Sequence, residues 1–133
     1  MQYQWLLTRA AAARARAYCP YSGFAVGAAL LATSGAVYTG CNVESASFGA
    51  TICAERNALT TAVGAGDRAF TALAIVAGDA HTPPCGICRQ LLAEFGDMTV
   101  LYADAALTAV RETTLSALLP DGFVLTPPTS VKG

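Results

Sequence analysis

Three cysteines are spaced as metal ligands rather than as a disulfide framework. Cys85 and Cys88 form a C-x-x-C motif at the expected start of a helix, and Cys53 stands at an earlier expected helix start. Alone, a C-x-x-C motif is typical of a redox pair or of half a zinc ribbon. The chain has no second C-x-x-C motif and no pair of histidines, so a closed four-ligand site would lack its fourth ligand. Three ligands with an open position are typical of catalytic zinc, whose bound water ionises near neutral pH.

A water that acts as a nucleophile needs a base, and Glu55 lies two residues after Cys53. Two steps along a regular helix rotate by about 200°, so the two side chains can converge only at an irregular first turn, where the sequence places them. We expect burial to move the pKa of Glu55 toward neutrality. Arg56 is predicted to draw negative charge from the thiolates, the alternative being an exposed helix arginine.

The elements that must position these residues alternate between helices and strands. We expect helices at 1–18, 53–63 and 85–95, strands at 24–32, 37–43, 71–77 and 99–103, and a short strand and helix within 109–119. The apolar strands in this order indicate an α/β fold, a three-layer αβα sandwich around a mixed, mostly five-stranded sheet. Residues 1–133 are expected to form a single domain.

Composition excludes several classes of protein. A chain of 133 residues with 54% hydrophobic and 13% charged side chains is not intrinsically disordered. Apolar runs are too short to span a membrane and the start does not resemble a signal peptide, so we expect a cytoplasmic protein without a membrane partner. Eight basic residues balance nine acidic ones and form no basic stripe, which argues against nucleic acid as a partner.

The motifs C-A-E and P-C-x-x-C, in this order, resemble those of the zinc-dependent cytidine deaminases, in particular the small homotetrameric type. The resemblance extends to a substrate-pocket strand, a ribose-binding segment, two metal helices and a C-terminal pattern, at residues 17–30, 40–46, 51–59, 84–91 and 118–123. It implies one Zn²⁺ per chain on Cys53, Cys85 and Cys88, with Glu55 as the catalytic general acid and base.

The resemblance also implies the reaction and the substrate contacts. The reaction is hydrolytic deamination of cytidine and 2′-deoxycytidine to the uridines by attack of zinc-bound hydroxide at C4, with release of ammonia, as in pyrimidine salvage. The implied substrate-binding residues are Phe24 on the pyrimidine, Asn42 and Glu44 on the ribose, Ala54 and Phe123. An amide and a carboxylate two positions apart on a strand project to one face. The carboxylate would repel a phosphate, which favours a free pyrimidine nucleoside as substrate.

Alternatives stay open at this point. Phe24 would otherwise be a core residue, and Asn42 and Glu44 would be polar residues facing a turn. A structural zinc module would hydrolyse nothing, a polynucleotide deaminase would need a basic channel, and a deaminase of nucleoside antibiotics is expected to differ in the segment around Asn42. Phe48 replaces the tyrosine that the family often has.

For the cysteines and the histidine outside the motifs we expect structural positions without a role in the chemistry. Cys19 and Cys41 are expected to be packing residues and His81 a surface residue. The apolar composition suggests a homotetramer, because a monomer would expose much apolar area. Phe123 either covers its own subunit or reaches a neighbour's pocket to stack on the bound pyrimidine.

Overall fold

The computed structural model describes residues 2–127 and is built on a five-stranded mixed sheet in the order β2-β1-β3-β4-β5. Only β3 and β4 run parallel, and the other neighbouring pairs are antiparallel. The strands are β1 (Val26–Ala32), β2 (Val37–Cys41), β3 (Phe70–Ala77), β4 (Thr99–Asp104) and β5 (Val110–Thr114). This arrangement confirms the predicted mixed sheet and the predicted hairpin between its first two strands.

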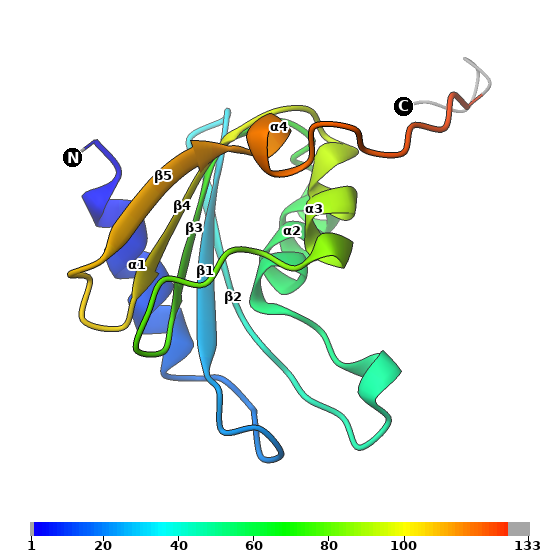
Figure 1. The fold of residues 1–133 in the computed structure, drawn as a ribbon. Coiled ribbons are helices and arrows are strands. Elements are labelled where there is room, and N and C mark those ends of the chain that lie inside the picture. Colours follow the sequence, from blue (N-terminus) through cyan, green and yellow to red (C-terminus); the bar gives the residue numbers. More distant parts are fainter. Residues whose placement is uncertain (1, 128–133) are drawn as a thin grey trace.

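Helices cover both faces of the sheet, which confirms the three-layer sandwich. Figure 1 shows α1 on one face and α2 and α3 on the other. The helices are α1 (Gln4–Arg14), α2 (Ala54–Gly64), α3 (Gly86–Ala93) and the short α4 (Leu115–Leu118), with a 3₁₀ turn at Phe48–Ala50. None of the helices within residues 2–127 is long and apolar enough to cross a membrane.

The central strand β3 shows why the sheet is covered on both sides. Leu73 and Ile75 belong to the apolar cluster under α2 and α3, whereas Ala72, Ala74 and Val76 belong to the cluster under α1. Successive side chains of a strand point to opposite faces, so a nearly continuous apolar run buries both of them. The sheet is therefore a rigid platform whose two faces are each closed by helices.

The start of α2 lies directly against the end of β2. A Cβ added at Gly40 would come within 2.6 Å of the Ala54 carbonyl oxygen and the Ala58 amide nitrogen. The Asn57 side-chain amide also donates to the Cys41 carbonyl at 3.0 Å. Only glycine permits this close approach of two backbones. The first turn of α2, which follows Cys53, is thereby fixed against the sheet.

Element boundaries differ from the sequence expectations by a few residues. The first helix ends at Arg14 rather than at residue 18. The Arg14 Nε donates to the Ala25 carbonyl at 2.9 Å. The strand β2 ends at Cys41. The Asn42 amide still donates to the Val26 carbonyl at 3.2 Å, but the Val26 amide donates to the Asn42 side chain at 2.9 Å instead of to the Asn42 carbonyl. Val43 instead forms isolated bridges to two other segments.

Candidate active site and metal centre

Two helix starts bring the three predicted cysteine ligands together. Cys53 is the N-cap of α2, Cys85 is the N-cap of α3, and Cys88 lies in the first turn of α3. Their Sγ atoms all lie within 4.8 Å of one another, and those of Cys53 and Cys85 are 3.8 Å apart. We call these three residues the cysteine cluster. Cys88 is buried and Cys85 is exposed, so the cluster has an inner and an outer side.

The donor set of the cysteine cluster fits zinc. Tetrahedral zinc with Zn–S bonds of about 2.3 Å separates its sulfur ligands by about 3.8 Å, which matches the 3.8 Å between the Cys53 and Cys85 sulfurs. Both helices direct the positive ends of their dipoles at the sulfurs, which stabilises thiolates there. The Cys88 thiol and the Arg56 guanidinium lower the pKa of Cys53 to about 5.

Arg56 takes the position predicted for it beside the cluster. One of its terminal nitrogens lies 3.6 Å from the Cys53 sulfur and donates to the Thr51 carbonyl at 3.1 Å. Its Nε is buried and finds no hydrogen-bond partner within residues 2–127. A buried guanidinium donor beside three sulfurs is consistent with a strongly negative neighbour, as three metal-bound thiolates would be.

Glu55 is a buried carboxyl group in the first turn of α2, two residues after Cys53. Only 5% of its surface is exposed, and loss of hydration raises its pKa to about 7. The expected shift toward neutrality is therefore present, and burial is its main cause. Ala54, between these two residues, is fully buried and belongs to the apolar cluster under α2 and α3, so its predicted contact with the substrate stays a prediction.

The segment around Asn42 runs beside the segment that leads to Cys53. Val43 and Ile52 exchange two backbone hydrogen bonds of 2.9 Å, which places the predicted ribose-binding residues next to the predicted ligands. The Asn42 side chain is buried: its Oδ1 accepts from the Val26 amide at 2.9 Å and its Nδ2 donates to the Phe24 carbonyl at 2.8 Å. Asn42 therefore fixes the backbone at the start of β1.

The Glu44 side chain is held by hydrogen bonds, whereas the Phe24 ring packs over a glycine and is partly exposed. The Glu44 carboxylate accepts hydrogen bonds from the Tyr21 and Ser22 amides and from the Ser22 hydroxyl, which lower its pKa. Phe24 is 44% exposed, and its ring covers Gly78, where an added Cβ would lie 2.8 Å from the ring. The role of Ser22 was not predicted from the sequence, because no motif links it to a carboxylate 22 positions away.

The chain matches a known family over most of its length. Residues 1–104 match the family model described as the cytidine and deoxycytidylate deaminase zinc-binding region. The chain belongs to this deaminase family. It is 48% identical to the cytidine deaminase of Sporosarcina psychrophila over 127 residues, which cover 92% of each chain. It is 44% identical to the cytidine deaminase of Mycobacterium tuberculosis strain H37Rv over 94% of this chain and 92% of the relative.

Solved deaminase structures share the fold. The crystal structure of the cytidine deaminase from Burkholderia pseudomallei superimposes with a TM-score of 0.87 at 45% identity, covering 92% of this chain and all of that one (100%). Family membership and the cysteine cluster together assign one Zn²⁺ per chain and a zinc-dependent hydrolytic deaminase activity. Membership of this deaminase family argues against the two alternative interpretations of the cysteines, a structural zinc module and a redox pair.

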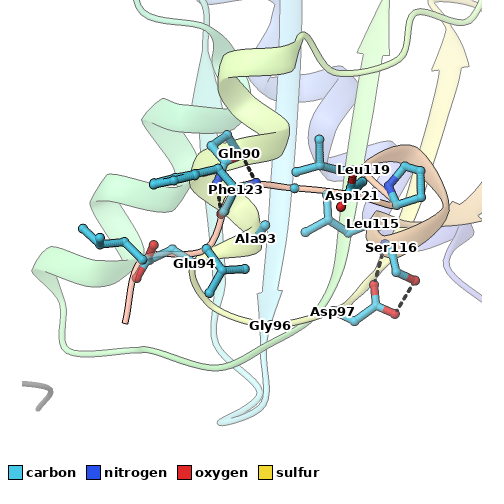
Figure 2. A pocket seen from close by; sticks show the side chains of 14 residues that line it. Gln90, Ala93, Glu94, Gly96, Asp97, Leu115, Ser116, Leu119, Asp121 and Phe123 are labelled. Atoms are coloured by element: carbon cyan, nitrogen blue, oxygen red, sulfur yellow. Dashed lines mark hydrogen bonds between the residues drawn. The ribbon is translucent and has the colours of Figure 1, made fainter. Parts of the chain in front are cut away.

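The C-terminal part of this deaminase is attached to α3 by two residues that the sequence did not single out. The Gln90 side-chain amide donates to the Phe123 carbonyl at 2.8 Å and accepts from the Phe123 amide at 3.2 Å, as Figure 2 shows. Arg89 donates to the Pro84 carbonyl at 2.7 Å and to the Leu118 carbonyl at 2.8 Å. Because the contacts with Phe123 and Leu118 join residues about thirty positions apart, no local pattern indicates them.

Phe123 borders a pocket of about 400 Å³ between α3, α4 and the residues that follow α4. The cysteine cluster does not line this pocket. The Phe123 side chain is 72% exposed, so it covers little of its own subunit.

The remaining cysteines and the histidine lie outside the cysteine cluster. The Cys41 thiol donates to the Arg16 carbonyl at 3.5 Å, and Cys19 is partly buried, in agreement with packing roles. His81 is partly exposed and does not belong to the cysteine cluster, in agreement with its expected assignment as a residue that holds no metal. Its ring is partly buried edge-on to Tyr102, with centroids 5.3 Å apart, because the loop before Cys85 packs against β4.

Replacing Arg56 with glutamine is expected to weaken zinc binding by about 10-fold to 100-fold, because outer groups that support metal ligands typically have effects of this size. The loss is measured by competition with a chromogenic chelator. Arg9→Gln, at an exposed position of α1, is the matched control. Equal zinc affinity in the Arg56 variant and the control would contradict the role given to Arg56.

Proposed function

We propose that this deaminase converts free cytidine and 2′-deoxycytidine into uridine and 2′-deoxyuridine, with release of ammonia, and that the whole chain acts as one domain. The observation that carries the proposal is a carboxyl group, Glu55, buried at the first turn of the helix that Cys53 caps. A carboxyl group in that position lies beside the residues that would hold the metal, where hydrolysis needs a base. The relatives at 44–48% identity are named cytidine deaminases.

The cysteine cluster and Glu55 divide the chemistry between them. Zinc held by the three thiolates supplies Lewis acidity, which makes water a nucleophile near neutral pH. Glu55 accepts a proton from the attacking water and delivers it to pyrimidine N3 while the oxygen bonds to C4. Glu55 then moves the second proton of that oxygen to the exocyclic amine. Ammonia leaves, C4 keeps the oxygen as a carbonyl, and N3 keeps its proton, which gives the uridine.

The substrate contacts follow from the free hydrogen-bonding capacity of the site. Phe24 has an exposed ring face for the pyrimidine. A carboxylate offers about four acceptor positions, and Glu44 uses three of them within the chain. Asn42 keeps one N–H after donating to Phe24. Together Asn42 and Glu44 can donate to and accept from a sugar hydroxyl, and the negative charge of Glu44 disfavours a phosphate at that position.

A reducing compartment suits this site. All five cysteines are free, and three of them must stay thiolates to hold zinc. Disulfides persist in oxidising compartments, whereas cytosolic thiols are kept reduced. These observations support the cytoplasm as the location.

Replacing Glu55 with glutamine is expected to lower kcat by about 10²-fold to 10⁴-fold, the usual contribution of a positioned acid or base. Folding and zinc content should be unchanged, because the side chain is not a ligand. The measurement is an ultraviolet assay on cytidine, 2′-deoxycytidine, adenosine and cytosine, with metal analysis of the same samples. Glu112→Gln, exposed on β5, is the control. Near-normal turnover in Glu55→Gln would assign the base elsewhere, and a wild type inactive on both cytidines would refute the proposed substrate.

A homotetramer with shared active sites is the assembly we propose. Support comes from large apolar side chains left exposed near the C-terminal end and beside the substrate segment: Phe48, Phe123, Val124 and Leu125 are 79%, 72%, 82% and 75% exposed. Phe123, Val124 and Leu125 are consecutive in the chain, and exposed apolar surface of this kind typically marks an interface. In the proposed tetramer the exposed Phe123 ring would stack on a neighbour's bound pyrimidine, while Gln90 holds the Phe123 backbone.

Replacing Phe123 with alanine is expected to raise KM for cytidine by about tenfold, the order of an aromatic stacking contact. Both kcat and zinc content should stay at wild-type values, because Phe123 takes no part in the chemistry. Trp5→Ala, which removes an exposed aromatic ring from α1, is the control. Steady-state kinetics and sedimentation are measured together, and a fully active monomer would contradict the shared site.

A further inference from the structure

Ser22 connects the two parts of the proposed nucleoside site. Its hydroxyl donates to Oε2 of Glu44 and accepts from the Phe24 amide at 3.0 Å. Its own amide donates to Oε1 of Glu44 at 3.1 Å, next to the Tyr21 amide at 3.0 Å. A serine hydroxyl has one donor and two acceptor positions, so this hydroxyl forms a chain from the Phe24 backbone to the Glu44 carboxylate.

The backbone on either side of this chain is held in place independently. Tyr18 and the segment at 42–44 form a parallel bridge, in which the Tyr18 amide donates to the Asn42 carbonyl at 3.0 Å and the Glu44 amide to the Tyr18 carbonyl at 2.9 Å. The Gly23 amide closes the loop on the Cys19 carbonyl at 2.9 Å. Loss of the Ser22 hydroxyl would therefore leave the loop backbone connected and remove one specific restraint.

The restraint concerns the rotation of the Glu44 carboxylate. The terminal torsion of glutamate is broad, so contacts rather than intrinsic preference determine where the two oxygens lie. The two backbone amides hold Oε1, and within the described residues the Ser22 hydroxyl is the donor given for Oε2. A pocket of about 370 Å³ opens beside these groups, lined by Tyr21, Ser22, Glu44, Ser45, Phe48 and Thr51.

We propose that Ser22 is a positioning residue that fixes Oε2 of Glu44 for one hydroxyl of the substrate sugar. The inference rests on the proposed function and extends it, because it names the residue that sets recognition of the sugar. Ser22 acts through Glu44 and contacts neither the pyrimidine nor the metal ligands. The Ser22 hydroxyl should therefore strengthen binding of nucleosides that carry the sugar hydroxyl and leave binding of nucleosides without it unchanged.

The test compares Ser22→Ala and Ser22→Thr with wild type on cytidine and on 2′,3′-dideoxycytidine. Removing a hydrogen bond to a charged group is expected to raise KM for cytidine about tenfold in Ser22→Ala, with kcat and zinc content unchanged. KM for the dideoxynucleoside should change less than about twofold, and threonine, which keeps the hydroxyl, should restore the value for cytidine. The affinity for uridine, measured by calorimetry, should fall in parallel with the KM effect.

Ser34→Ala is the matched control. Ser34 lies in the turn between β1 and β2, and its hydroxyl accepts from the amide two residues later at 3.3 Å, as that of Ser22 does. Within residues 2–127 no carboxylate contacts the Ser34 hydroxyl. The inference is overturned if KM of Ser22→Ala for cytidine is unchanged, if it rises equally for both nucleosides, or if zinc is lost. A wild type that does not deaminate cytidine would instead refute the proposed function, and this assignment with it.

Discussion

The gathering of three thiolates at two helix starts is the constraint on which the rest of this structure depends. Three negative sulfurs within 4.8 Å repel one another unless positive charge compensates them. The compensation comes from the N-terminal ends of α2 and α3, from Arg56 at 3.6 Å from the Cys53 sulfur, and from the metal itself. Both helices must therefore point at one place, and a sheet covered on both faces keeps them there.

The same arrangement explains how Glu55 can be both buried and close to Cys53. In a regular helix these side chains would diverge, but Cys53 is an extended N-cap residue with φ −68° and ψ 154°. The chain turns sharply at this position, and the Glu55 carboxyl group comes close enough to the Cys53 and Cys88 sulfurs to interact with both. The close packing of Gly40 against the Ala54 carbonyl leaves this turn little freedom to shift.

Much of the fold and the metal centre can be predicted from the sequence because their signals are local. Apolar runs such as 71–77 and 99–103 identify the strands, and cysteines at helix starts identify the ligands. Hydrogen bonds between distant segments leave no such signal. The pairs Ser22–Glu44 and Gln90–Phe123 join residues 22 and 33 positions apart, and neither pair has a pattern of its own. The ring contact between His81 and Tyr102 likewise joins a loop to β4 and has no local signal.

The central claim is that one zinc on the cysteine cluster, with Glu55 beside it, performs the hydrolysis. The most direct test removes zinc with a chelator and restores it in measured steps, following metal content and cytidine deamination in the same samples. Activity is predicted to rise in proportion to bound zinc and to stop rising at one equivalent per chain. Full activity in zinc-free protein, or one bound zinc per chain without deamination, would contradict the account.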